Sequence, residues 1–150
     1  MTEIKLVTFK EVSEDPNFQG LLAEYAIESA IEGLPRPNCQ IDMYKSMEEM
    51  GIIHILGSFK DGVMTGFISL VVTVIPHYGA TVATTESYFV GEAYRKDGAG
   101  LMLLREAERY AAILGAVGLL VSAPFGGKLA EVMSKTGYTE SNLVFFRSLE

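Results

Sequence analysis

The sequence predicts a mixed α/β fold, in which helices cover both faces of one β-sheet. The first observation is an almost wholly apolar run, Val117–Ser122, which is typical of a strand buried on both faces. It follows a helical segment that itself follows a strand ending at Val90, and such a strand–helix–strand unit makes its two strands parallel. The second observation is the Asp-Gly turn at Lys60-Asp61-Gly62, which predicts an antiparallel hairpin. The sheet should therefore combine parallel and antiparallel pairs, in a single domain over residues 1–150.

The first third of the chain predicts one strand and two helices. The strand is expected over Ile4–Phe9, where apolar and polar side chains alternate. Asp15, which a proline follows, is typical of a helix start, and this helix should end near Gly33. A second, shorter helix is expected over Ile41–Met50, with Gly51 as its C-terminal stop.

The rest of the chain predicts a three-stranded meander followed by alternating helices and strands. The main helix is expected over Gly98–Leu114, where apolar residues gather on one face and charged residues lie opposite. The other expected elements are strands over Ile52–Phe59, Val63–Ile75 and Ala80–Val90, the buried strand described above, a helix over Gly126–Thr136 and a final strand over Asn142–Leu149.

Composition limits the classes of partner. The chain has 19 acidic and 12 basic residues, a net charge of −7 and an isoelectric point of about 4.9, so we expect no nucleic-acid partner. The single Cys39 is expected to be a packed side chain, and no Cys/His spacing predicts a metal site. The uncharged stretches Phe67–Ile75 and Tyr110–Phe125 are too short or too interrupted to span a membrane. With no signal-like segment in the sequence, we expect a cytoplasmic protein with no membrane partner.

A glycine-rich loop connects the central strand to the main helix. Gly98 and Gly100 lie where the chain enters this helix, and a helix N-terminus offers free N–H donors and partial positive charge. Glycine lets a ligand approach the backbone closely, and phosphate suits this geometry. Arg95 and Lys96 add cationic charge beside the loop. The alternative is a tight strand-to-helix turn without a ligand. The loop is neither a Walker loop nor a dinucleotide-binding fingerprint, because it lacks their remaining residues.

The residues around this loop resemble a known family. The pattern Arg95-x-x-Gly98-x-Gly100 resembles the Arg/Gln-x-x-Gly-x-Gly/Ala signature of the GNAT superfamily of acyl-CoA-dependent N-acetyltransferases. Phe89-Val90 is similar to the end of the family's fourth strand, and Lys135-Thr136-Gly137-Tyr138 resembles its late "k-x-G-F/Y" element. Order and spacing agree from about Ile52 to the C-terminus, whereas the N-terminal third fits loosely.

The resemblance implies a GNAT-like acyl-CoA N-acyltransferase fold that uses acetyl-CoA as cosubstrate. An acetyl group would move to a primary amine of a small molecule, peptide or protein by direct attack, with both substrates bound together. Pantetheine would pair with the backbone of Phe89 and Val90. The pyrophosphate would rest on backbone N–H groups beside Arg95, and these belong to Lys96, Asp97, Gly98, Ala99, Gly100 and Leu101.

Glu86 is the candidate general base, because an attacking amine must lose a proton and a carboxylate can take it. Period-two alternation predicts that Glu86 shares a face of the strand with Thr84, Tyr88 and Val90. The alternative is a structural glutamate, paired with an arginine or bonded to loop amides. The resemblance favours the base, since the Glu-x-x-Phe-Val form is similar to members whose glutamate acts through a bound water. The oxyanion donor would be the backbone N–H of Val90 or a neighbour.

The general acid is where the sequence departs from the family pattern. Many members carry a tyrosine on the last helix, and Met133 stands at that position here. Ser122, Tyr88, Tyr138 or water could protonate the leaving thiolate instead. This departure keeps a second interpretation open, a non-catalytic acyl-CoA-binding or regulatory module, and a third, a protein that retains only the fold.

The acceptor amine is the least determined part of the function. Acidic residues on the second helix, Asp42, Glu48 and Glu49, are expected to border the acceptor cleft and to favour a cationic acceptor. The alternative is that they form a solvated helix face. The sequence leaves open the acceptor's identity, the preferred acyl chain and the oligomeric state, including a homodimer.

Overall fold

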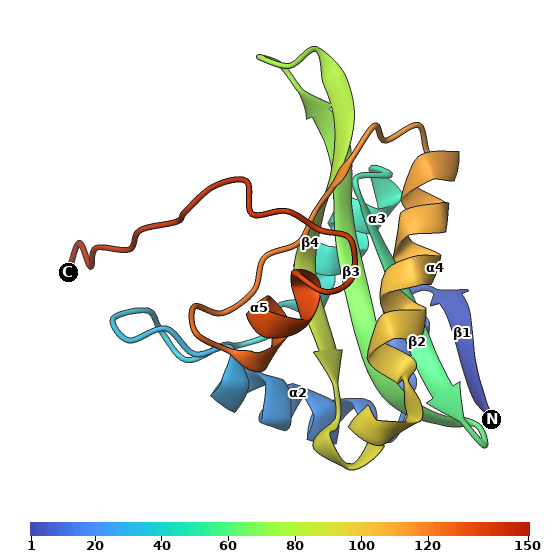
Figure 1. Cartoon of the computed structure of the whole chain (residues 1–150). Coiled ribbons are helices and arrows are strands. Elements are labelled where there is room, and N and C mark those ends of the chain that lie inside the picture. The colour runs from blue at the N-terminus through green and yellow to red at the C-terminus, as the bar shows by residue number, and fades with distance from the viewer.

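The computed structural model describes all residues from 1 to 150 and contains one five-stranded sheet (Figure 1). The strands lie in chain order across the sheet. Neighbouring strands from the first to the fourth are antiparallel, and the fourth and fifth are parallel, so the predicted mixed sheet is confirmed. The strands are β1 (Thr2–Val7), β2 (Ile53–Lys60), β3 (Val63–Ile75), β4 (Ala80–Val90) and β5 (Leu119–Leu120).

Helices cover both faces of this sheet, as predicted. One apolar core lies under the helices of the N-terminal third and includes Phe67 and Phe89, and a second lies under the main helix and includes Ile68 and Val90. In Figure 1 the main helix, α4, passes in front of the strands while α3 lies behind them. None of the helices is both long and apolar enough to cross a lipid bilayer. The helices are α1 (Phe9–Glu14), α2 (Phe18–Glu28), α3 (Ile41–Glu49), α4 (Ala99–Ile113) and α5 (Lys128–Met133), with a 3₁₀ helix, η1 (Glu92–Asp97), between β4 and α4.

Helices α1 and α3 are fastened to each other. The Glu48 carboxylate on α3 accepts a hydrogen bond from the Phe9 backbone N–H at 3.1 Å, where the first turn of α1 lacks helical partners. The Phe9 ring stacks on Tyr44 of α3, with ring centroids 4.7 Å apart and planes 11° from parallel. These contacts fix α3 against α1, and the Glu48 carboxylate has a structural role in them.

A β-bulge interrupts the pairing of β3 with β4. Ser69 lies opposite Ser87 and Leu70 lies opposite Thr85, so Glu86 is the extra residue on β4. The bulge reverses the alternation beyond it, and Tyr88 packs beside α4 while Glu86 faces α3. The prediction that Glu86 shares a face with Tyr88 and Val90 is therefore wrong, because period-two alternation holds only where the pairing is regular.

The region after α4 differs most from the sequence prediction. The expected strand Val117–Ser122 is reduced to β5, and it is not buried on both faces, since Val117 is 77% exposed. Pairing with β4 ends at Leu120, and the Ser122 N–H donates to the Thr85 side-chain hydroxyl at 3.0 Å in place of a backbone carbonyl. An apolar run becomes a long strand only where a neighbouring backbone continues the ladder.

The two last predicted elements also change. The helix expected over Gly126–Thr136 is α5, which is limited to Lys128–Met133. The expected strand Asn142–Leu149 is absent, and this segment runs exposed along the end of the chain, away from the sheet (Figure 1). Its apolar residues favour a strand, but no strand of this chain pairs with it.

We expect a side chain at Gly66 to destabilise the fold. A Cβ atom there would lie 2.6 Å from the Phe89 carbonyl oxygen and 3.0 Å from the Val90 Cα, both backbone atoms of β4. Gly66→Ala should therefore lower the free energy of unfolding by roughly 1–3 kcal/mol, measured by urea denaturation. Gly20→Ala is the matched control, because its Cβ would meet nothing nearer than 4.0 Å and α2 should gain up to about 1 kcal/mol. Equal stability of the two variants would contradict this account.

Candidate active site

Glu86 is held at the bulge by donors from two different elements. The Tyr44 hydroxyl on α3 donates a hydrogen bond to one carboxylate oxygen, Oε1. The Ser69 hydroxyl on β3 donates to the other, Oε2, at 2.9 Å, and the Ser69 and Ser87 hydroxyls are 2.6 Å apart. Glu86 is otherwise exposed, so both oxygens are oriented while the carboxylate stays accessible from solvent. This arrangement suits a group that exchanges a proton with a bound ligand.

Three weakly acidic groups lie within the electrostatic reach of Glu86. Burial, and then the negative charge of Glu86, raises the pKa of Tyr25 and of the Cys39 thiol above their usual values. Burial raises the pKa of Tyr44 as well, and its hydrogen bond to Glu86 raises it further. All three groups are therefore neutral at pH 7, and they add no charge beside the carboxylate.

The glycine loop forms an uncapped helix N-terminus, as the sequence predicts. Gly98 has φ of 78° and ψ of 9°, a left-handed conformation that strongly favours glycine, and no side chain caps α4. The first helical hydrogen bond runs from the Met102 N–H to the Gly98 carbonyl, so the N–H groups of Ala99, Gly100 and Leu101 have no helical acceptor. These donors and the helix dipole make this end suitable for an anion.

Arg95 and Lys96, two cations near this loop, differ in whether their charge is paired within the protein. Arg95 Nε donates to the Val90 carbonyl at 2.9 Å, and its Nη2 donates to the Glu28 carboxylate at 2.6 Å. Its guanidinium also lies over the Phe89 ring, 5.3 Å from the centroid. Arg95 therefore ties the end of β4 to α2, and its charge is already paired. Lys96 forms no ion pair and is the cation left free beside the glycine loop.

The strand edge between Glu86 and the glycine loop is open. Beyond the pair Thr84–Leu120 the chain that follows β5 turns away toward α5 (Figure 1). The Gly91 N–H donates to the Thr65 carbonyl at 2.9 Å, and antiparallel alternation then directs the backbone groups of Phe89 toward β3 and those of Tyr88 and Val90 toward the open edge. An extended ligand can pair with this edge as an added strand does.

Two of the four candidate acids are already engaged. The Tyr88 hydroxyl donates to the Gly100 carbonyl on the α4 face, and burial, partly offset by the nearby Arg105 charge, raises its pKa to about 12. The Tyr138 hydroxyl donates to the Glu108 carboxylate at 2.7 Å, and burial followed by that hydrogen bond raises its pKa. Met133 is buried and has no proton to give. Ser122 and water remain, since the Ser122 hydroxyl makes no hydrogen bond within the protein.

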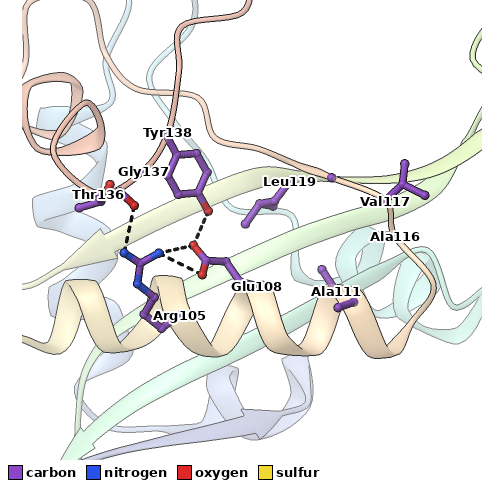
Figure 2. A pocket seen from close by; sticks show the side chains of 11 residues that line it. Arg105, Glu108, Ala111, Ala116, Val117, Leu119, Thr136, Gly137 and Tyr138 are labelled. Carbon is purple, nitrogen blue, oxygen red and sulfur yellow. Dashed lines mark hydrogen bonds and ion pairs between the residues drawn. The ribbon is translucent and has the colours of Figure 1, made fainter.

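A cavity of about 500 Å³ lies elsewhere, between the second half of α4 and two loops (Figure 2). Of the candidate site residues that the sequence predicted, it contains only Tyr138, one of the candidate acids. Arg105 donates to the Thr136 carbonyl at 3.0 Å and to Glu108, which also accepts from Tyr138, so this cluster fastens the loop after α5 to α4. The predicted "k-x-G-F/Y" element thus serves as an anchor.

Sequence reasoning did not find the groups that surround Glu86. Tyr44 lies on a predicted helix, but its partner is 42 residues away along the chain, and helical periodicity carries no information on such a pair. Ser69 and Ser87 meet only because of the bulge, which leaves no signal in the local sequence. The Ser69 hydroxyl, within the largely apolar strand β3, was the one available hint.

Comparison with known proteins identifies the family. The model of the Acetyltransferase (GNAT) family matches residues 16–126, and the chain belongs to this family. It is therefore an N-acetyltransferase, a member of an enzyme family that takes the acetyl group from acetyl-CoA. The resemblance drawn from Arg95, Gly98 and Gly100 is confirmed, and the enzymatic interpretation is favoured over a protein that keeps only the fold. No curated protein sequence matches the chain significantly.

Solved structures confirm the fold at low sequence identity. An aminoglycoside acetyltransferase from an uncultured soil metagenomic sample has a TM-score of 0.77 and 17% identity, with 100% of this chain and 99% of that chain covered. A ribosomal-protein-alanine N-acetyltransferase from Brucella melitensis biovar Abortus 2308 has a TM-score of 0.74 and 16% identity, with 97% and 96% covered. AAC(6')-Iy, in complex with the bisubstrate analog CoA-S-monomethyl-acetylneamine, has a TM-score of 0.72 and 17% identity, with 98% and 97% covered.

Proposed function

We propose that the protein transfers the acetyl group of acetyl-CoA directly to a primary amine, with Glu86 taking the proton that the amine loses. One observation carries this proposal. An accessible carboxylate, oriented by Tyr44 and Ser69, lies on the same strand whose open edge leads to an uncapped helix N-terminus. A proton acceptor and an anion site are thereby joined by a stretch of unpaired backbone, which fits a ligand with a phosphate at one end and a reactive group at the other.

The residues present fit acetyl-CoA, which supplies an activated acyl group as a thioester. We assign its phosphates to the backbone N–H groups of Ala99, Gly100 and Leu101, which have no helical acceptor, with the free Lys96 ammonium beside them. We assign its amide-containing arm to the open edge at Tyr88 and Val90. Arg95 acts indirectly, because it holds the end of β4 and the loop together. The complex of AAC(6')-Iy with a CoA bisubstrate analog supports this kind of site in the family.

The chemical roles follow from what each group can still donate or accept. Glu86 accepts the amine proton, directly or through a water, as the nitrogen bonds to the acetyl carbon. The Val90 N–H is the donor we assign to the acetyl oxygen, since its carbonyl is occupied by Arg95 and its N–H faces the open edge. The sulfur that leaves takes its proton from the Ser122 hydroxyl or from water, and the carbon–sulfur bond breaks as the carbon–nitrogen bond forms.

For the acceptor we propose a cationic amine, such as a polyamine, an aminoglycoside-like amine or a lysine-rich peptide. Glu86 is negatively charged, whereas the neighbouring groups Tyr25, Cys39 and Tyr44 are neutral. Two further carboxylates, Asp42 and Glu49, lie exposed on the helix that carries Tyr44. Glu48 does not contribute, because its carboxylate binds the N-terminus of α1. A region that carries one sign of charge concentrates ligands of the opposite charge. Two of the similar structures are an aminoglycoside acetyltransferase and an enzyme bound to an acetylneamine derivative.

We expect saturating acetyl-CoA to stabilise the protein. At about 100 times its dissociation constant it should add roughly 2.7 kcal/mol to the free energy of unfolding. For a domain of this size the midpoint should rise by about 5–10 °C in a thermal-shift assay. Gly100→Val should remove most of this rise and leave the apo protein folded. Gly100→Ala is the matched control and should retain most of it, because its Cβ would meet only ordinary contacts at 3.7 and 3.8 Å. A folded wild type that shows no shift would refute the proposed cofactor.

We expect Glu86→Gln to lower turnover by roughly 10²–10⁴-fold, because the amide cannot accept the amine proton. Its affinity for acetyl-CoA should stay unchanged, since Glu86 faces α3 and the anion site lies at α4. Steady-state kinetics and calorimetric titration separate the two quantities. Glu14→Gln, which removes an exposed carboxylate on α1, serves as the charge-matched control. Full turnover in Glu86→Gln would make Glu86 structural.

We expect cationic acceptors to outcompete neutral and acidic amines. The measurement is a rate survey over a polyamine, an aminoglycoside, a lysine-rich peptide, a neutral amine and an acidic amino acid, at low and at high salt. Cationic acceptors should lead at low salt and lose part of their advantage as ionic strength rises, because salt screens the carboxylates. An acidic acceptor in first place, or a ranking that salt does not alter, would contradict the proposal.

A further inference from the structure

Tyr44 is the one aromatic hydroxyl bonded to the Glu86 carboxylate, and its position is set by rigid neighbours. Its ring stacks on Phe9 at 4.7 Å with an angle of 11° between the planes. Phe9 is itself fixed, because its backbone N–H donates to Glu48 one turn further along the same helix as Tyr44. The hydroxyl is therefore presented to Glu86 by a closed set of contacts between α1 and α3, which requires little further ordering.

Glu86 needs such a partner because of where it lies. It is the extra residue of the bulge, where local pairing is disrupted, and its side chain is exposed. An exposed glutamate samples several rotamers unless hydrogen bonds select one. Ser69 holds Oε2, but the Ser69 hydroxyl also contacts Ser87 at 2.6 Å and is thus shared. Tyr44 alone holds Oε1.

Resting on the function proposed above, we propose that Tyr44 is a positioning residue: its hydrogen bond to Oε1 fixes the Glu86 carboxylate in the orientation that receives the amine proton. Tyr44 acts through Glu86 and is not itself the group that exchanges a proton with the acceptor. Its hydroxyl proton is committed to the carboxylate, and burial and the Glu86 hydrogen bond keep it a neutral donor by raising its pKa.

The neighbouring groups allow the role of Tyr44 to be isolated. The groups that face Glu86 are Tyr25 from α2, Cys39 from the segment before α3, Tyr44 from α3 and Ser69 from β3. Tyr25 is a second phenol within reach of the same charge, yet it makes no hydrogen bond to Glu86 and packs edge-on against Phe67 at 5.6 Å. Tyr25→Phe is therefore a control that removes a nearby phenol without removing a hydrogen bond to the carboxylate.

The kinetic test compares Tyr44→Phe, Tyr25→Phe, Glu86→Gln and the Tyr44→Phe/Glu86→Gln double variant. A hydrogen bond to a charged group is worth enough that Tyr44→Phe should lower kcat by about 10- to 100-fold. The KM for acetyl-CoA should not change, so the loss should appear in kcat alone. Tyr25→Phe should change kcat by less than about twofold. In the Glu86→Gln background Tyr44→Phe should have no further effect, since residues that act as a unit are not additive.

A second readout does not depend on turnover. In a titration followed by NMR of tyrosines labelled at Cζ, Tyr25 and Tyr44 should both ionise at lower pH in Glu86→Gln than in the wild type, because both lose a nearby negative charge. The signal that is absent from Tyr44→Phe should move further than that of Tyr25, since Tyr44 also loses its hydrogen bond to the carboxylate. An unchanged titration of Tyr44 in Glu86→Gln would show that the hydrogen bond is absent and would overturn the proposal.

The outcomes separate this proposal from the one on which it rests. Full turnover in Glu86→Gln would remove the base, and with it any positioning role for Tyr44. A strong defect in Glu86→Gln together with wild-type kcat in Tyr44→Phe would overturn the positioning role alone. A Tyr44→Phe variant that loses only thermal stability, with kcat unchanged, would make the tyrosine structural and would equally overturn the positioning role.

Discussion

The pairing of β4 determines the rest of the site. This strand is paired with β3 from Ala80 to Val90 except at Glu86, but only two of its residues pair with β5. The loss of pairing on one edge leaves backbone donors and acceptors exposed, a cost that a strand normally avoids. The bulge on the other edge places Glu86 and Ser87 on one face in succession. One interrupted strand thus supplies both an oriented carboxylate and an open edge, and neither feature would exist in a regular ladder.

Strand β4 is fixed at the bulge and at its C-terminal end by contacts that leave this edge free. At the bulge, Ser69 and Tyr44 bind the Glu86 side chain and leave the backbone edge alone. At the C-terminal end, Arg95 binds the last carbonyl of the strand and reaches across to Glu28 on α2. The arginine that the family signature contains is thus engaged within the protein, and it secures the turn into η1 and α4. The loop is therefore already ordered, and it loses little conformational entropy when its N–H groups bind a ligand.

The parts of the structure that could be predicted are those with a local cause. The turn at Gly98 is predictable because a left-handed residue before a helix calls for glycine, and α4 because its apolar residues recur with helical period. The bulge at Glu86 and the contact with Tyr44 depend on which strand and helix lie opposite, so periodicity misplaced the carboxylate. The expected strand Asn142–Leu149 failed for the same reason, because a strand exists only with a partner.

The site can be divided in the same way, into backbone groups with local causes and side chains that depend on distant contacts. The cofactor half that we propose consists of backbone groups on β4 and in the first turn of α4, and the positions of these groups follow from the ladder and from Gly98. Substitution of most side chains there leaves the donors in place. The acceptor half that we propose consists of side chains from α3 and β3 gathered around Glu86. Those side chains can change without altering the ladder, so the acceptor can vary while the cofactor site is retained. The hydrogen bond from Tyr44 joins the two halves, since a side chain of α3 fixes the Glu86 side chain of β4. Substitutions in α3 should therefore affect the rate of transfer as well as the choice of acceptor.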